Sequence, residues 1–227
     1  MSELPYRVRR SDRARRARIV VGADGVEVVV PRRVPLRQVV PFVEAKRPWI
    51  ERTLRRQREA AADAPRIRLE PGGELPYLGE RLALDVRREP GRRRAHVARD
   101  GDRLVVRLPA GGDLRAAVEA WYRRRARAEV ARRLDAACAR AGRRYSKLTI
   151  RGQRTRWASC SSSGAMSFNW RLLLAPAEVL DYVVEHEVAH LDHHDHSPAF
   201  WALVAERCPG WREREDWLRR CGPALRL

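Results

Sequence analysis

The sequence predicts a protein of the α+β class, and three observations support that prediction. Its first half alternates short apolar runs with Asp-Gly steps, which is typical of antiparallel hairpins. A long run of helical spacing begins near residue 114, and a later helical run contains two histidines four residues apart. We therefore expect a β-rich N-terminal domain over residues 1–112, with one helical excursion, and an α+β domain over residues 113–227.

The first predicted element is a hairpin. Strand-like residues 18–21 and 26–30 flank Ala23-Asp24-Gly25, and the Asp-Gly step suits a tight turn between two strands. The same alternation and a second Asp-Gly step predict two more strand pairs. These further strands are expected at residues 75–79, 82–86, 95–97 and 104–108.

A helix interrupts these strands. Apolar residues within 39–54 recur at helical spacing, and Pro48 marks either a kink or a break between two helices. The polar, alanine-rich residues 57–65 are interpreted as a connector.

The second domain is predicted to begin with a long helix. Asp113 is a suitable N-cap, and Gly142 follows the last apolar residue at helical spacing. Two strands are expected next, at residues 148–150 and 166–170, separated by a turn over 159–164. Two helices that carry the histidines complete the domain.

The motif that indicates chemistry is His186-Glu187-Val188-Ala189-His190. Histidines four residues apart on a helix point the same way, about 6 Å apart along the axis, so both can bind one metal ion. Glu187 then lies beside the ion without being needed as a ligand. A buried helix is predicted by the apolar residues Val179, Leu180, Tyr182, Val183 and Val184. Such a helix carries these polar groups only where something pairs with them.

A third ligand is expected from the segment that follows. If the helix continued, His193 would lie roughly 10 Å beyond His186 along the axis, which is too far for a shared tetrahedral site. Ser197-Pro198 is a helix start, so His196 lies where the chain turns back, and we predict it as the third ligand. Four neighbours keep open roles, either orienting a ligand imidazole or facing solvent: Asp192, His193, His194 and Asp195.

The histidine spacing also occurs in the metzincin proteases. Those enzymes have glycine at the third spacer position and a methionine turn downstream. Here His193 occupies the glycine position, and Met1 and Met166 both precede the motif. The sequence therefore does not support that class.

Long motifs surround the histidines on both sides. They are Gln153-Arg154-Thr155-Arg156-Trp157-Ala158-Ser159-Cys160-Ser161-Ser162, Ser167-Phe168-Asn169-Trp170-Arg171-Leu172, Asp181-Tyr182-Val183-Val184 and His196-Ser197-Pro198-Ala199-Phe200-Trp201. Together they resemble the YgjP-like metallopeptidase family, whose relatives are the SprT-like proteases. The resemblance extends from the first strand pair to Trp211.

The resemblance implies a minigluzincin-like zinc peptidase domain with an HExxH active-site helix. It assigns one zinc ion to His186, His190 and His196, and it makes Glu187 the catalytic glutamate. The chain departs from the family at Ala158, where glycine is usual. An added methyl group argues against a left-handed turn there but does not affect the metal ligands.

A substrate cleft is expected beside the active-site helix. As a hypothesis, an edge strand over residues 167–171 and the loop over 157–161 hold an extended polypeptide by strand addition. Phe168 and Trp170 are equally well explained as core residues. The predicted substrate-binding residues are Trp157, Asn169, Trp170 and Arg171.

Composition indicates an ordinary enzyme of the cytoplasm. The chain has 227 residues, and none of its apolar runs approaches the roughly 20 residues of a membrane span. Its polar start is unlike a signal peptide. The four cysteines are widely spaced without a CxxC pair, so neither a disulfide framework nor a cysteine metal site is expected.

The net charge of +19 raises the question of nucleic-acid binding. Nearly all of this charge is arginine, spread from Arg7 to Arg226, with local runs such as Arg92-Arg93-Arg94. Two interpretations stay open, a polyanion-binding surface and a solvated arginine-rich surface.

The sequence therefore predicts a zinc-dependent metallopeptidase that acts on a protein or peptide. Glu187 would activate a zinc-bound water for attack on the peptide bond. The alternative is a basic, DNA-associated protein. It would be either a SprT-like protease that acts on DNA-bound proteins or a binding module whose structural metal site is closed by a fourth ligand from His193, His194 or Asp195.

Overall fold

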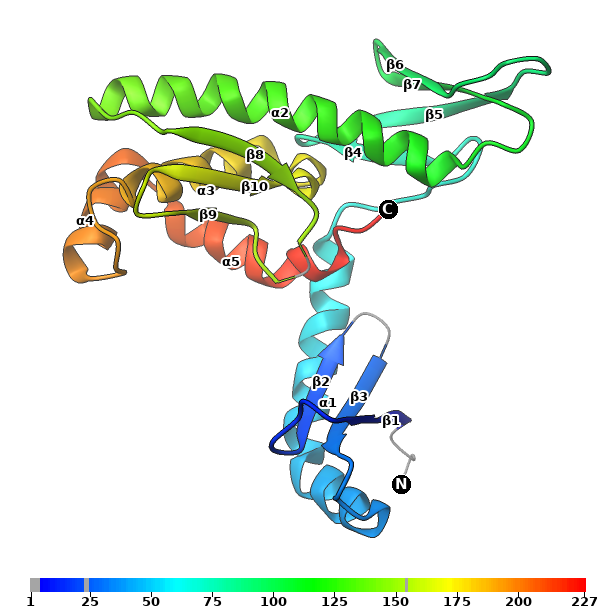
Figure 1. Cartoon of the computed structure of the whole chain (residues 1–227), viewed down its shortest axis with the longest axis vertical. Coiled ribbons are helices and arrows are strands. Elements are labelled where there is room, and N and C mark those ends of the chain that lie inside the picture. The colour runs from blue at the N-terminus through cyan, green and yellow to red at the C-terminus, as the bar shows by residue number, and fades with distance from the viewer. Residues whose placement is uncertain (1–4, 23–24, 154) are drawn as a thin grey trace. The chain divides into compact units, whose positions relative to one another are not determined.

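The computed structural model describes residues 5–22, 25–153 and 155–227, and within 56–63 it describes the backbone alone. The chain divides into two compact units, Met1–Ala64 (unit 1) and Pro65–Leu227 (unit 2). Each unit has its own hydrophobic core. None of the helices in the described part of the chain is long and apolar enough to cross a membrane. The α+β class is confirmed (Figure 1).

Unit 1 is a three-stranded sheet with one helix. Its elements are β1 (Tyr6–Ser11), β2 (Arg18–Gly22), β3 (Gly25–Pro31), η1 (Leu36–Gln38) and α1 (Val39–Asp63). The strand order is β1-β3-β2, with β2 and β3 antiparallel as the hairpin pattern predicted. Ala23 and Asp24 of the expected turn lie outside the described residues. Strand β1 was not predicted, because its apolar positions are interrupted by arginines.

Helix α1 covers one face of this sheet. The alternating residues Val26, Val28 and Val30 of β3 pack with Val43 and Ile50 of α1 in the unit 1 core. The helix runs through Pro48 without a break. It also continues to Asp63, which corrects the expected connector over residues 57–65, because the run of alanines there has high helix propensity.

Unit 2 begins with a four-stranded sheet. Its strands are β4 (Glu74–Tyr77), β5 (Glu80–Arg88), β6 (His96–Asp100) and β7 (Arg103–Leu108), in the order β4-β5-β7-β6. All four lie where the sequence predicted strands. Leu84 and Leu104 of this sheet share one core with Val118 and Tyr122 of helix α2 (Leu114–Ala141). The chain therefore divides at Ala64 rather than at the expected residue 112, since burial of these side chains joins the sheet to the helix.

Helix α2 begins and ends at the predicted caps. The backbone N–H of Ala116 donates to Oδ1 of Asp113 (3.2 Å). At the other end Gly142 adopts φ 62°, the left-handed conformation that glycine accommodates without steric cost.

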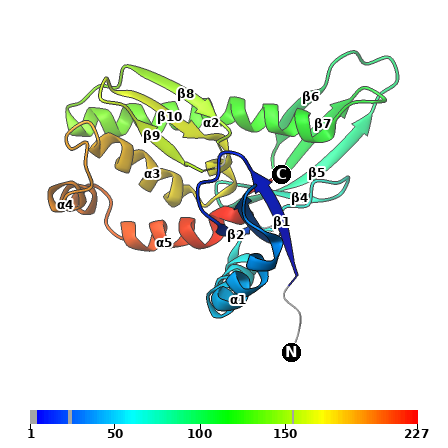
Figure 2. The same ribbon diagram turned by 60° about the horizontal axis from the view of Figure 1, so that its bottom comes forward.

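A second sheet and three helices complete unit 2. The sheet consists of β8 (Lys147–Arg151), β9 (Ala158–Cys160) and β10 (Ala165–Asn169), in the order β8-β10-β9. Helices α2 and α3 (Ala177–Ala189) lie on one face of it (Figures 1 and 2). The remaining elements are η2 (Trp170–Leu174), α4 (Pro198–Arg207), α5 (Trp211–Cys221) and η3 (Gly222–Ala224). Strand β9 and helix α5 were not predicted, β9 because it is only three residues long and α5 because its charges hide the apolar spacing of Trp211 and Leu218.

We predict that Leu134→Ala destabilises unit 2 by about 2–5 kcal/mol, because the truncated side chain leaves a cavity in the core. Leu134 is completely buried on α2. Urea denaturation monitored by circular dichroism measures the free energy of unfolding. Arg124→Ala, at an exposed position of the same helix, serves as the control and should change it by less than about 0.5 kcal/mol.

Candidate metal centre

Helix α3 carries the motif and ends inside it. Its last residue is Ala189, and His190 caps it with φ −67° and ψ −13°. The backbone N–H of His190 donates to the carbonyl oxygen of His186 (3.3 Å). Both imidazoles therefore lie on the last turn and point to the same side. The preceding residues 179–184 are apolar, apart from the exposed Asp181, and buried, as expected for this helix.

The start of α4 places the third histidine. Ser197 is the N-cap, its Oγ accepts a hydrogen bond from the Phe200 N–H (3.5 Å), and Pro198 takes the first helical position. The carboxylate of Asp195 accepts from the Ser197 N–H (3.3 Å). These bonds fix the chain at the point where His196 returns towards α3.

Phe200 forms the floor beneath the three imidazoles. Its ring centroid lies 4.9 Å from that of His186, 4.6 Å from His190 and 4.8 Å from His196. The side chain is completely buried. No site role was predicted for Phe200, although its place in the first turn of the helix that follows His196 was an available signal.

The three imidazoles have the geometry of a ligand set. Their ligand nitrogens all lie within 4.8 Å of one another. Nε2 of His186 and Nε2 of His196 are 3.2 Å apart. Two nitrogens at about 2.05 Å from a tetrahedral zinc ion lie roughly 3.3 Å apart, so this pair already has the required separation.

A hydrogen bond sets the orientation of His190. Nδ1 of His190 lies 3.0 Å from the carbonyl oxygen of His193. A carbonyl oxygen can only accept, so Nδ1 carries the proton and Nε2 keeps its lone pair. Such a bond to the second ring nitrogen is a common feature of ligand histidines.

Burial keeps two of the imidazoles neutral. It lowers the pKa of His186 to about 3, with smaller contributions from repulsion by His190 and His196. Burial also lowers the pKa of His190, opposed by the hydrogen bond to His193. Both rings are therefore unprotonated at neutral pH, which is the state that binds a metal ion.

Glu187 is a buried acid without a partner. Its side chain is 5% exposed, and within the described residues its Oε2 atom has no hydrogen-bond partner. Burial raises the pKa of this carboxyl to about 8. A buried carboxylate of this kind needs a nearby positive charge to stay ionised at neutral pH, and a cation held by the adjacent histidines would supply it.

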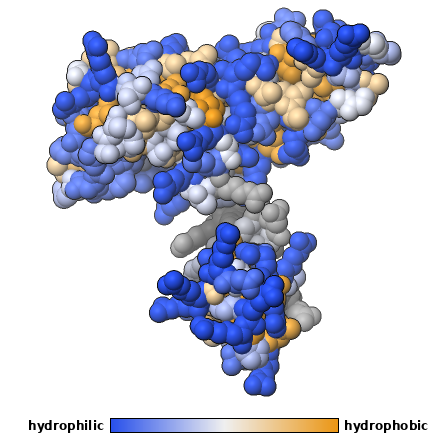
Figure 3. Space-filling view, viewed as in Figure 1, coloured by the Kyte–Doolittle hydropathy of each residue, from blue (hydrophilic) through white to orange (hydrophobic). Residues whose placement is uncertain are grey.

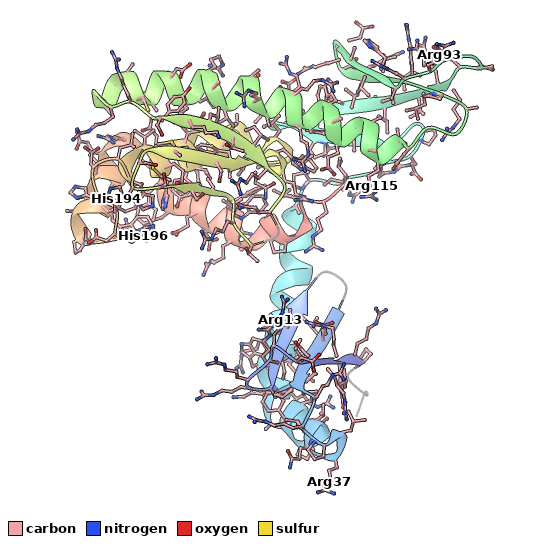
Figure 4. All side chains as sticks on the ribbon, in the orientation of Figure 1. Arg13, Arg37, Arg93, Arg115, His194 and His196 are labelled. Atoms are coloured by element: carbon pink, nitrogen blue, oxygen red, sulfur yellow. The ribbon has the colours of Figure 1, made fainter. Side chains whose placement is uncertain are left out.

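The residues between His190 and His196, whose roles the sequence left open, lie outside the cluster of possible ligands. Asp192 pairs with Arg143 and with Arg207 (3.1 Å), so its carboxylate is occupied. His193 contributes its backbone carbonyl to His190. His194 is exposed at the left margin of the molecule in Figure 4. Among the described residues, the cluster of possible ligands contains only His186, His190 and His196.

A pocket of about 400 Å³ adjoins Glu187 and His186. Trp157 and Ala158 line one side, and Leu218 of α5 lies on the pocket wall. The full lining is Arg156, Trp157, Ala158, Tyr182, Val183, His186, Glu187, Glu215, Leu218 and Arg219. Of the predicted substrate residues, only Trp157 lies here. Sequence reasoning missed Leu218 because helix α5 was not recognised.

The other three predicted substrate residues do not line this pocket. Asn169 is 3% exposed, and its Nδ2 donates to the carbonyl oxygens of Gln153 (2.7 Å) and Arg156 (3.2 Å). Its Oδ1 accepts from the Arg171 N–H (3.2 Å). Trp170 is completely buried, and the Arg171 guanidinium lies over its ring at 4.8 Å. These contacts describe a structural cluster that fixes the segment before β9.

The edge strands of the second sheet are β8 and β9, not the predicted strand over residues 167–171. Strand β10 lies between β8 and β9, so both of its edges are occupied. The carbonyl oxygen of Trp157 accepts a hydrogen bond from the Asn169 N–H (2.7 Å), and the Ser161 N–H donates to the carbonyl oxygen of Ala165 (2.9 Å). In an antiparallel pair this bonding alternates, so the backbone groups of Ala158 and Cys160 point away from β10. Ala158 also lines the pocket that contains Glu187.

The fold and the histidine cluster together define a metallopeptidase type of site. The chain belongs to the YgjP-like family: residues 15–221 match the YgjP-like, metallopeptidase domain. This confirms the resemblance seen in the sequence motifs.

A solved structure is also similar in sequence. It is the crystal structure of the metallopeptidase zymogen of Pyrococcus abyssi abylysin, with 30% identity. The match covers 38% of this chain and 89% of that chain, with a TM-score of 0.36. No curated protein matches the chain.

We predict that Asn169→Ala destabilises unit 2 by about 1–3 kcal/mol, because the buried amide of Asn169 no longer bonds to the carbonyl oxygens of Gln153 and Arg156. Asn169→Asp should destabilise unit 2 further, since it places a carboxylate against the same two carbonyl oxygens. Thermal unfolding compares both variants with Ser163→Ala, an exposed turn position that should behave like the wild type. If Asn169→Asp were as stable as the wild type, the structural role of Asn169 would be wrong.

Proposed function

We propose that this protein is a zinc-dependent peptidase in which Glu187 is the general base. The observation that carries the proposal is the buried, unpartnered carboxyl group of Glu187 beside three clustered imidazoles. Burying an unpaired carboxyl group lowers the stability of the folded protein, and a bound cation would offset this cost. The family membership independently supports a hydrolase.

Zinc is the ion that this ligand set fits best. Three neutral imidazoles without a carboxylate ligand suit a borderline-soft ion and leave a fourth position open. When bound, the ion would supply Lewis acidity that makes water a better nucleophile near neutral pH. His186, His190 and His196 would hold it, and the His193 carbonyl would fix the tautomer of His190.

Glu187 would move the proton. Its Oε2 accepts a proton from the attacking water and returns it to the leaving amine as the peptide bond breaks. The pKa of about 8 in the metal-free protein means that the carboxyl is then mostly protonated at pH 7. A cation at the histidines lowers this pKa, so the base becomes available when the metal ligands are occupied.

Strand β9 supports an extended polypeptide as the substrate. The outward backbone groups of Ala158 and Cys160 can pair with a substrate strand, as in other cases of β-strand addition. A strand bound there passes along the pocket that contains Glu187. The apolar walls formed by Trp157, Val183 and Leu218 would accept an apolar side chain of the substrate.

A structural metal site is the weaker alternative. Such a site would need a fourth protein ligand. His194 is exposed, and the Asp195 carboxylate bonds to the Ser197 N–H, so neither belongs to the described ligand cluster. The three-member cluster favours a site with an open position.

We expect Glu187→Gln to bind zinc with unchanged stoichiometry and to lose peptide hydrolysis by at least about 100-fold, because the amide cannot accept the proton. Metal analysis and cleavage of a peptide library measure the two effects. Glu185→Gln is the matched control. Glu185 is also buried on α3 but pairs with Arg140 instead of adjoining the histidines, so this variant should keep its activity. Wild-type hydrolysis by the Glu187→Gln variant would contradict the assignment.

We also expect Leu218→Trp to narrow the pocket and change substrate choice. Cleavage of peptides with a large apolar residue at the affected position should fall by about 10-fold or more, while peptides with alanine there are less affected. Leu218→Met, which conserves volume, is the control. Equal losses for both peptide classes would show that this pocket does not select the substrate side chain.

A further inference from the structure

The sheet of unit 1 has a second face that α1 does not cover. Residues alternate along a strand, so the register that directs Val28 to α1 directs Val29 to the opposite face. Arg9 of β1 and Arg18 of β2 are the cross-strand partners of Val29. The two arginines therefore flank Val29 on this face, about 10 Å apart between their backbones. Arg7 lies two residues before Arg9 on β1 and therefore faces the same side of the sheet.

Val29 is buried between these two arginines of the neighbouring strands. Val29 is 0% exposed although it does not belong to the core against α1. The aliphatic stems of its two neighbours can cover the valine while their charged ends stay in water. The side chain of Arg9 is 51% exposed. The guanidinium groups are thus presented from a rigid strand framework.

The turn from β1 to β2 adds three more arginines. Arg13, Arg15 and Arg16 lie between β1 and β2, and all three are exposed. Figure 4 labels Arg13, whose side chain projects from a different part of unit 1 than that of Arg37. We define the arginine surface as Arg7, Arg9, Arg13, Arg15, Arg16 and Arg18.

The arginine surface has little internal neutralisation. Arg9 pairs with Glu27 at 3.0 Å, and no other ion pair joins this surface to any residue that the structure describes. In unit 2, by contrast, Arg133, Arg143 and Arg207 all pair with carboxylates. Residues 1–64 contain 16 lysine and arginine residues against 8 acidic ones, a net charge of +8 in little more than a quarter of the chain. The visible face of unit 1 is accordingly mostly hydrophilic (Figure 3).

We propose that the arginine surface of unit 1 binds double-stranded nucleic acid through its phosphates. Arginine presents a planar fork of donors that matches a phosphate, and a rigid row of such groups complements a regularly charged backbone. Among the described strand residues that share this sheet face, none is an aromatic residue on which unpaired bases could stack, which favours a duplex over a single strand. Contacts to phosphate alone make the binding independent of base sequence.

An anionic membrane is the less favoured partner. Membrane binding by a basic surface is strengthened by apolar side chains that enter the lipid. Among the described strand residues, Val20, 44% exposed, is the only exposed large apolar side chain on this sheet face. The exposed Leu36 and Val40 lie on η1 and at the start of α1, away from the strands that carry the arginines.

The test compares two triple variants of the full chain with the same change in charge. Arg13→Ser/Arg15→Ser/Arg16→Ser alters the arginine surface. Arg92→Ser/Arg93→Ser/Arg94→Ser alters a loop of unit 2, where Figure 4 labels Arg93. Fluorescence anisotropy measures the affinity for a random-sequence DNA duplex at several salt concentrations. Circular dichroism checks that both variants are folded, and a variant Arg7→Ser/Arg18→Ser repeats the test on the strands.

The expected result is specific to unit 1. Removing three phosphate contacts should reduce the slope of log affinity against log salt concentration by about 2–3 and weaken binding at least about 10-fold. The unit 2 variant should stay within about 2-fold of the wild type. Equal losses in both variants, salt-insensitive binding, or tighter binding to phosphatidylserine vesicles than to the duplex would each overturn the proposal. Duplex binding by Glu187→Gln should equal that of the wild type. The test of nucleic-acid binding is therefore independent of the test of peptidase activity.

Discussion

The packing of Phe200 against three imidazoles is the contact on which the candidate site depends. Two of the histidines belong to the end of α3, and the third precedes α4. Phe200 touches all three rings from below, so the hydrophobic burial of one side chain joins α4 to α3 and fixes the mutual positions of the ligands. Trp201 extends this packing, because its ring stacks on Trp211 of α5 at 4.4 Å. Helix α5 in turn supplies Leu218 to the pocket.

The same burial sets the electrostatics of the site. Removing water lowers the pKa of His186 and raises that of Glu187, so that the metal-free site is close to neutral. A neutral buried site is tolerable for the fold, and a cation bound at the histidines would favour ionisation of the carboxyl group. Packing and electrostatics are therefore coupled. The residues that exclude water from the histidines also raise the pKa of Glu187, so that its carboxyl group stays protonated without a nearby positive charge.

The two units have different kinds of surface. Unit 2 combines a large shared core with arginines that are often paired to carboxylates across its helices. Unit 1 is smaller; one face of its sheet packs against α1, and the other carries Arg9 and Arg18 on either side of Val29. A basic module joined by the chain to a peptidase domain would bring hydrolysis close to proteins on a nucleic acid. In that arrangement the proposed binding and the proposed hydrolysis would be complementary functions.

Local signals in the sequence determined much of this protein. They were sufficient for the β2–β3 hairpin, the strands of the first unit 2 sheet, both caps of α2, the HExxH helix and the helix start that brings His196 into place. Only the tertiary structure decided that the sheet of β4 to β7 shares a core with α2, that β9 rather than β10 is an edge strand, and that Asn169 and Trp170 are internal. The reason is physical. Caps, turns and periodicity depend on residues a few positions apart, whereas an edge, a pocket wall or a buried face depends on which distant segments come to lie beside it.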